Sequence, residues 1–187
     1  MALRYRPGRS VEMAVSKARE HVLCGLEWLV DADIRKFFDW IPHAGLKKVL
    51  KQTIPDREIL KLVDLWLDVG APRTGILSRR RGVPQGGVLS PFFCNCYLTA
   101  FDRKLAERNL PFVRFADDFL VFTPNKEAAE AALVFVGNVL KKMDLELHPE
   151  KTRVVRSGPK VVFLGRKMPR PLSLLGGLTW LHICNAL

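Results

Sequence analysis

The chain has 187 residues, of which 48% are hydrophobic and 26% charged, a balance typical of a globular protein and not of a disordered one. It carries 30 Lys and Arg against 19 Asp and Glu, so its formal net charge is +11. A polyanion such as nucleic acid is therefore the first partner to consider, with a membrane surface as the alternative. No stretch reaches the roughly 18 uninterrupted apolar residues of a spanning helix. Residues 1–10 lack the apolar run of a signal peptide, so we expect a cytoplasmic protein that does not enter a membrane.

A strand, two helices and a loop are predicted in the first half of the chain. The segment "EWLVDADI" alternates in side-chain character, which predicts a half-buried strand over residues 27–34 with Asp33 near its C-terminal end. Apolar residues at helical spacing predict helices over residues 43–53 and 55–70. Residues 73–91 form a basic, glycine-rich segment that is typical of a loop.

The second half is predicted to contain two helices, a hairpin and two short strands. Ser90 and Pro91 suit the N-cap and first position of a helix that runs to about Arg108. Aromatic and β-branched residues on both sides of two adjacent acids predict a hairpin over residues 112–122 with its turn at Ala116–Asp118. Beyond the hairpin we expect a helix over about 125–143, strands over 151–156 and 160–167 around a turn at 157–159, and no assignable period in 169–187.

This order of elements favours an α+β fold in which helices back an antiparallel sheet. The four cysteines predict neither a disulfide framework nor a zinc site. Cys94 and Cys96 are two positions apart in a predicted helix and would not share a face, while Cys24 and Cys184 stand alone. We expect buried thiols.

Three acids would converge if the strand ending at Asp33 pairs with the hairpin that carries Asp117 and Asp118. Like charges at close range raise one another's pKa, and a divalent cation relieves the repulsion. Oxygen ligands without His or Cys favour Mg²⁺ or Mn²⁺ over zinc, and two such ions would suit an in-line phosphoryl transfer. The alternative is that Asp-Asp simply fills a turn.

Five segments in this order resemble the palm motifs of bacterial reverse transcriptases, most closely the group II intron-encoded type. They are "DADIRKFFD" (31–39), "GVPQGGVLSP" (82–91), "VRFADDFLVF" (113–122), "HPEKTRVV" (148–155) and "FLG" (163–165). In addition, "YRPGRS" (5–10) resembles the segment that precedes the palm in this family. Phe115 stands where the family usually has tyrosine.

The resemblance implies a polymerase palm-like antiparallel sheet backed by helices, with part of the fingers and no thumb. The palm would occupy residues 1–167, and residues 168–187 would be a divergent C-terminal tail. We therefore expect a chain truncated at both ends relative to a complete enzyme of this type.

The resemblance also assigns a catalytic centre. Asp33, Asp117 and Asp118 would be the catalytic acids and metal ligands, with Asp33 and Asp117 the principal ones and the carbonyl of Ile34 completing one ion. Lys151 would neutralise or protonate the leaving pyrophosphate; considered without the family, it is a solvated surface cation.

Further residues would contact nucleotide and nucleic acid. The amides of Lys36 and Phe37 would face the triphosphate, Phe38 would block a ribose 2′-hydroxyl, and Gln85 with Gly86 would support the incoming base pair. The residues expected to contact nucleic acid are Arg79, Arg80 and Arg81 at phosphates and Phe163, Leu164 and Gly165, which would form a turn that holds the primer end. Considered alone, Phe37-Phe38 is ordinary core, "GVPQGGV" an ordinary turn and the arginine run a solvated surface.

The function implied by the resemblance is RNA-directed DNA synthesis with Mg²⁺, or Mn²⁺ in its place. The partners would be an RNA template, a DNA or RNA primer and a dNTP, with intron RNA as a further candidate. The alternatives are an inactive remnant that binds structured RNA and another palm-like nucleotidyl transferase such as a cyclase.

Overall fold

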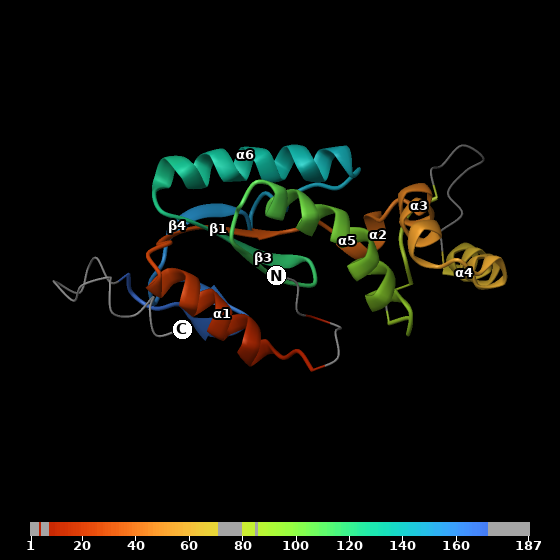
Figure 1. The fold of residues 1–187 in the computed structure, drawn as a ribbon, viewed down its shortest axis with the longest axis horizontal. Coiled ribbons are helices and arrows are strands. Elements are labelled where there is room, and N and C mark those ends of the chain that lie inside the picture. Colours follow the sequence, from red (N-terminus) through yellow and green to blue (C-terminus); the bar gives the residue numbers. More distant parts are fainter. Residues whose placement is uncertain (1–3, 5–7, 71–79, 85, 172–187) are drawn as a thin grey trace.

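The computed structural model describes residue 4 and residues 8–70, 80–84 and 86–171 (Figure 1). The helices are α1 (Val11–Leu23), α2 (Phe37–Trp40), α3 (His43–Thr53), α4 (Arg57–Gly70), α5 (Ser90–Glu107) and α6 (Lys126–Lys142). The strands are β1 (Trp28–Asp33), β2 (Phe112–Phe115), β3 (Asp118–Thr123), β4 (Arg153–Arg156), β5 (Val162–Phe163) and β6 (Arg166–Lys167). None of the helices in these ranges is both long and apolar enough to cross a membrane.

A four-stranded antiparallel sheet in the order β2-β3-β1-β4 is the centre of the fold. Figure 1 shows α5 and α6 on one face of this sheet and α1 on the other, with α3 and α4 beyond the end toward which β1 leads. Each face has its own apolar core: Val30 and Val121 contribute to the core under α5 and α6, and Leu29 and Leu120 to the one under α1. The expected α+β class with a helix-backed antiparallel sheet is confirmed.

Strand β1 is central because both of its edges are paired and both of its faces are covered. Its alternation places Leu29, Asp31 and Asp33 toward the α1 side and Val30 with Ala32 toward α5 and α6. The expected strand over 27–34 is present with bounds one residue shorter at each end. Its acids therefore lie on the α1 side of the sheet, beyond Leu29.

The helices expected in the middle of the chain are present, with one difference at the start of α5. Leu89 occupies the N-cap position, Ser90 is the first helical residue, and Pro91 follows inside the first turn. The Ser90 hydroxyl donates to the Pro84 carbonyl (2.5 Å) instead of capping the helix. Ser90 thus ties the helix to the glycine-rich loop before it.

The predicted hairpin is formed by β2 and β3, but its turn is tighter than expected. Phe115 pairs with Asp118, so the turn consists of Ala116 and Asp117 alone and Asp118 is the first residue of a strand. Ala116 has a φ of +64°, the left-handed conformation that two-residue hairpin turns require.

Helix α1 was not predicted from the sequence. The Ser10 hydroxyl caps it by accepting from the Met13 amide at 3.2 Å, and the buried residues Ala14, Ala18 and Val22 follow a four-residue spacing. This spacing was the available signal for a helix. Because α1 covers the second face of the sheet, it decides which part of that face stays open.

The expected single strand over residues 160–167 is wrong, whereas the turn that the resemblance implies at Phe163–Gly165 is present. Leu164 and Gly165 both have positive φ, +50° and +76°, and form a two-residue turn between β5 and β6. A left-handed pair of this kind reverses the chain, so β5 pairs with β6, whereas β4 pairs with the central strand β1.

No disulfide joins the three cysteines in the described ranges. Cys94 is buried, and burial, followed by the charge of nearby Asp117, raises the pKa of its thiol to about 12. Cys24 and Cys96 are half-buried, and Cys184 lies outside the described residues.

Candidate active site

The three acids meet where the central strands end. Asp33 is the last residue of β1 and lies directly opposite Asp118, the first residue of β3, while Asp117 precedes it in the turn. The condition that the sequence left open, pairing of β1 with the hairpin, is therefore met. The three carboxylates come from two elements separated by more than eighty positions in the chain.

Backbone hydrogen bonds hold this end of the sheet together. The Ile34 amide donates to the Asp117 carbonyl (3.2 Å), and the His148 amide donates to the Asp33 carbonyl (2.8 Å). Ile34 also forms an isolated antiparallel bridge with Leu147. The end of β1 is thus tied to the hairpin turn on one side and to the segment before β4 on the other.

Burial and neighbouring charges raise the pKa of two of the acids, Asp118 and Asp117. Burial is the largest cause of the shift at Asp118 and, with the charges of Asp31, Asp33 and Asp117, raises its pKa to about 7. The pKa of Asp117 is also raised, first by burial and then by Asp33. A bound cation would favour the ionised forms of these carboxyl groups.

Lys151 is the nearest cation in the described part of the site. Its Nζ lies 2.6 Å from Oδ2 of Asp33, and this hydrogen bond is the largest cause that raises the pKa of Lys151. The lysine side chain is 59% exposed, so it can reorient toward a ligand in the open part of the site. The expected proximity of Lys151 to the acids is observed.

The donor chemistry of the site suits Mg²⁺ in a particular way. Within the described residues, no three His, Cys, Asp or Glu side chains stand close enough to hold an ion by themselves. Mg²⁺ commonly binds proteins through one or two carboxylates and completes its octahedron with water and substrate phosphates. Asp33 and Asp117 fit that requirement, because they offer hard oxygen ligands from adjacent elements.

A cavity of about 550 Å³ opens beside the acids. Several residues expected to contact nucleotide line it together with Asp117: Lys36, Phe37, Phe38 and Gly86. Gly87, which like Gly86 was expected to let the backbone approach closely, lines it too, as do Asp39, Val88, Ser90 and Pro91, which sequence reasoning did not assign to the site. The cavity therefore joins the β2–β3 turn, Lys36 with helix α2, the glycine-rich loop and the start of α5.

Two adjacent phenylalanines have different environments in the cavity wall. Phe37 is 1% exposed and belongs to the core, as expected for this residue when the family resemblance is set aside. Phe38 is half-buried and meets the Phe37 ring edge-on, with 5.8 Å between centroids. Lys36, with a φ of +43°, turns the chain between the end of β1 and α2.

Hydrogen bonds attach the glycine-rich loop to α2. The Val83 amide donates to the Phe38 carbonyl, and the Gly82 amide donates to the Ile41 carbonyl, each at 2.8 Å. Gly82 has a φ of +87°, and a Cβ there would lie 3.0 Å from the Asp39 carbonyl oxygen. Only glycine allows so close a backbone approach at this φ, and Gly86, farther along the chain, lines the cavity.

The comparisons with known proteins decide the family. The profile described as "Reverse transcriptase (RNA-dependent DNA polymerase)" matches residues 2–168 of this chain. The chain belongs to the reverse transcriptase family.

Two similar proteins place this reverse transcriptase domain more closely. Protein YkfC of Escherichia coli (strain K12) is 27% identical over 92% of this chain, and the match covers 56% of YkfC. The group II intron-encoded protein LtrA of Lactococcus lactis subsp. cremoris is 29% identical over 81% of this chain and 24% of LtrA. The chain thus spans about half of one relative and a quarter of the other.

A solved structure shows the same fold. Apo telomerase from Candida tropicalis, truncated from its C-terminal domain, superposes with a TM-score of 0.67 at 18% identity. The match covers 88% of this reverse transcriptase domain and 38% of the telomerase chain.

The residues expected to contact nucleic acid do not all gather at the cavity of this reverse transcriptase domain. Arg80 forms an ion pair with Asp68, and the Arg81 guanidinium lies over the Trp40 ring at 5.8 Å. Phe163 is buried in the core under α1, and Leu164 with Gly165 forms the β5–β6 turn on that side. Arg79 and Gln85 lie outside the described residues.

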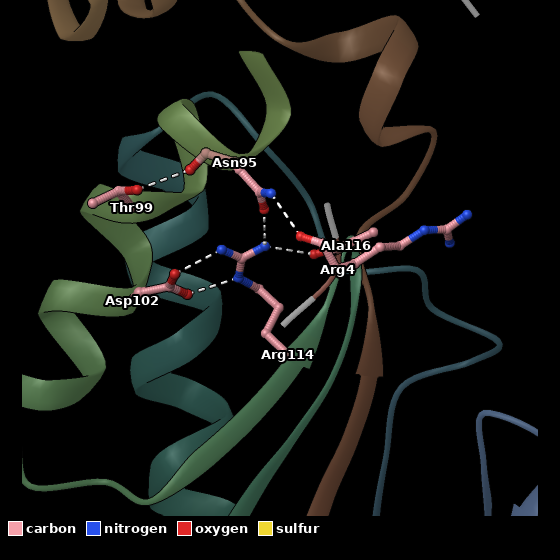
Figure 2. Close-up of polar contacts among 6 residues, drawn as sticks. All are labelled: Arg4, Asn95, Thr99, Asp102, Arg114 and Ala116. Carbon is pink, nitrogen blue, oxygen red and sulfur yellow. Dashed lines mark hydrogen bonds and ion pairs between the residues drawn. The ribbon is translucent and has the colours of Figure 1, made fainter. Parts of the chain in front are cut away.

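Sequence reasoning missed a buried arginine next to the acids. Arg114 in β2 is fully buried and forms an ion pair with Asp102 of α5 (Figure 2). A single arginine in an aromatic and β-branched strand was the available signal, since a buried arginine requires a partner. The pair lies on the α5 side of the sheet, whereas Asp33 and Asp118 point to the α1 side.

Proposed function

We propose that this chain carries the nucleotidyl-transfer site of an RNA-directed DNA polymerase. The observation that supports this best is the position of Asp33, Asp117 and Asp118 at one end of the sheet, beside a cavity of about 550 Å³ that Asp117 also lines. A cavity of this size is within the range of small-molecule sites. Three acids beside the cavity would repel a bare phosphate group, but they would attract the cations that accompany a nucleoside triphosphate.

The reaction would be an in-line displacement. The 3′-hydroxyl of a primer loses its proton to solvent, and its oxygen attacks the α-phosphorus of a dNTP. A new phosphorus–oxygen bond forms, the bond from the α-phosphorus to the oxygen that bridges to the β-phosphate breaks, and pyrophosphate leaves. Asp33 and Asp117 would hold Mg²⁺, which, when bound, supplies charge neutralisation and lowers the pKa of the 3′-hydroxyl. Asp118 lies directly beside them on β3 and contributes negative charge that favours retention of the cations.

Lys151 would act on the leaving group. In the structure the Lys151 ammonium group donates a hydrogen bond to Asp33. A pyrophosphate beside that carboxylate would be a second anionic partner for the lysine. Transfer of a proton from Nζ, or a hydrogen bond alone, would stabilise the charge that develops as the bridging bond breaks.

The cavity wall supports a deoxynucleotide. Phe38 is half-buried beside Phe37, and its ring borders the same space as Asp117. A rigid aromatic ring next to the sugar would leave no room for a 2′-hydroxyl. The RNA template is inferred from the family description and from the group II intron-encoded relative.

Primer extension tests the proposal. Purified chain, a poly-rA template with an oligo-dT primer, dTTP and Mg²⁺ should give incorporation that falls at least 100-fold in Asp117→Ala. Glu130→Gln, at an exposed acid on α6 paired with Lys126, is the matched control and should keep the original rate. An Asp117→Ala rate equal to that of the unsubstituted chain would contradict the mechanism.

A second candidate function is binding of structured RNA without synthesis. It is favoured by the net charge of +11 and by the Lys151–Asp33 ion pair, which neutralises one of the proposed metal ligands without a metal. RNA affinity that falls steeply with salt, equal affinity in Asp117→Ala, and no incorporation by either protein would support this alternative.

A further inference from the structure

A buried ion pair connects the hairpin that carries Asp117 to helix α5. Arg114 is 0% exposed, and its Nε and Nη2 donate to the two carboxylate oxygens of Asp102 at 2.7 and 2.6 Å. Figure 2 shows this two-pronged contact between the hairpin and α5. The pair does not enter the cavity and has no part in the chemistry proposed above.

The rest of the guanidinium group reaches the turn itself. Nη1 of Arg114 donates to the Ala116 carbonyl at 2.9 Å and to Oδ1 of Asn95 at 3.3 Å. The Asn95 amide group in turn donates to the Arg4 carbonyl at 2.7 Å. We call Arg114, Asp102 and Asn95 the arginine clamp (Figure 2).

The clamp acts on a strained residue. Ala116 has a φ of +64° and is 2% exposed. A residue with a Cβ disfavours this conformation, which persists only where the surroundings impose it. The hydrogen bond from Arg114 holds the carbonyl of this residue in place.

Both peptide groups that flank Asp117 are fixed. The Ala116 carbonyl shares a planar peptide with the Asp117 amide, and Arg114 binds that carbonyl. The carbonyl of Asp117 accepts from the Ile34 amide at 3.2 Å. The Cα of Asp117 is thus held from β1 on one side and by the arginine clamp on the other.

We propose that Arg114 is a positioning residue that holds the Ala116–Asp117 turn and so aims the Asp117 carboxylate at the site shared with Asp33. The catalytic consequence rests on the function proposed above. A buried ion pair is weak support for stability by itself. The geometry of the guanidinium group explains why this residue is an arginine. Its N–H groups can donate to both oxygens of Asp102 and also to the Ala116 carbonyl, whereas the lysine ammonium group is a single point charge.

The test combines Arg114→Lys with Ala116→Gly. Arg114→Lys should lower incorporation about 100-fold through kcat, with the KM for dTTP within about threefold, because Arg114 itself does not line the substrate cavity. Glycine takes a positive φ without a Cβ penalty, so adding Ala116→Gly should restore at least tenfold of the loss. Ala116→Gly alone is the reference, and Arg103→Lys, at an exposed arginine beside Asp102, is the matched control.

Amide hydrogen exchange gives a readout that needs no activity. In Arg114→Lys the Ile34 amide should exchange at least tenfold faster relative to the average of the β1 amides, and adding Ala116→Gly should slow its exchange again. If the unsubstituted chain incorporates nothing, the proposed function fails while this exchange comparison still decides the positioning role. Unchanged exchange at Ile34, or no recovery with Ala116→Gly, would overturn it.

A gentler variant covers the case in which Arg114→Lys does not fold. Asn95→Ala removes one side of the clamp and leaves the Arg114–Asp102 pair in place. It should raise exchange at Ile34 about threefold, and equal exchange in the two proteins would overturn the proposal.

Discussion

Asp33 and Asp118 lie directly opposite each other in the β1–β3 ladder, the last residue of one central strand against the first residue of its neighbour. Like charges directly opposite in a sheet are destabilising. Such a pair at the end of two central strands lowers the stability of the fold. It is typical of a site where the two acids serve to bind a cation.

We expect Asp118→Asn to stabilise the metal-free chain at high pH. The pKa of Asp118 is about 7 in the fold, against 3.8 ordinarily. Between about pH 4 and 7 the folded state therefore binds more protons than the unfolded chain, and the free energy of unfolding falls as the pH rises through this window. Removing the charge should add about 2 kcal/mol at pH 8, after allowance for solvent screening.

Urea unfolding with EDTA at pH 8 and pH 4 measures this effect. The difference between Asp118→Asn and the unsubstituted chain should be largest at pH 8 and close to zero at pH 4. Asp64→Asn, at an exposed acid paired with Lys47, is the control and should change stability by less than about 0.5 kcal/mol at either pH. A gain at Asp118 that does not depend on pH would show that the carboxyl does not carry a raised pKa.

Lys151→Met should separate catalysis from stability. The lysine is 59% exposed, and an ion pair of this kind contributes about 0–1 kcal/mol to the free energy of unfolding. The same substitution should lower kcat for incorporation by about 10- to 100-fold, because it removes the proposed general acid. Thermal unfolding and single-nucleotide incorporation measure the two effects.

Lys160→Met, at an exposed lysine in the turn after β4, is the control for Lys151 and should leave both quantities unchanged. Equal kcat in Lys151→Met and the unsubstituted chain would remove Lys151 from the mechanism.

Phe38→Val should relax sugar selection. A smaller side chain would open the cavity wall beside Phe37 and admit a 2′-hydroxyl, so the ratio of kcat/KM for dTTP over UTP should fall at least tenfold. Phe135→Val on α6, where the ring lies under Arg108 and away from the cavity, should keep the original ratio. If both variants discriminate equally well, another residue selects the sugar.

Two neighbouring glycines should differ in their tolerance of alanine. A Cβ at Gly87 would lie 2.7 Å from the Trp66 ring and 2.9 Å from the Ser90 hydroxyl, so Gly87→Ala should cost about 1–3 kcal/mol. Gly86 has a φ of +80° but open space around it, so Gly86→Ala should cost about 1 kcal/mol from backbone strain alone. Thermal unfolding ranks the two, and the reverse order would contradict the packing of this loop against α4.

The local patterns of the sequence were sufficient to predict most of the helices and strands. Alternation identified β1, and helical spacing identified α3, α4 and α6 close to their observed bounds. These features depend on neighbours a few positions apart, which is why a single sequence reveals them. Helix α1 carried the same kind of signal and was missed, whereas the β5–β6 hairpin depends on a non-glycine left-handed residue, Leu164, that no local rule predicts.

The sequence by itself determined that three acids would stand at strand ends or turns, and its ordered motifs determined the family. Only the tertiary structure decided that β1 pairs with β3, because that pairing joins segments far apart in the chain. It also decided that the pKa of Asp118 is raised to about 7, since burial and neighbouring charges cause that shift. The contacts of Arg114 likewise depend on the tertiary structure. Its partners Asp102 and Asn95 lie on α5 and Ala116 lies in the hairpin turn, and these elements come together only when the sheet packs against α5.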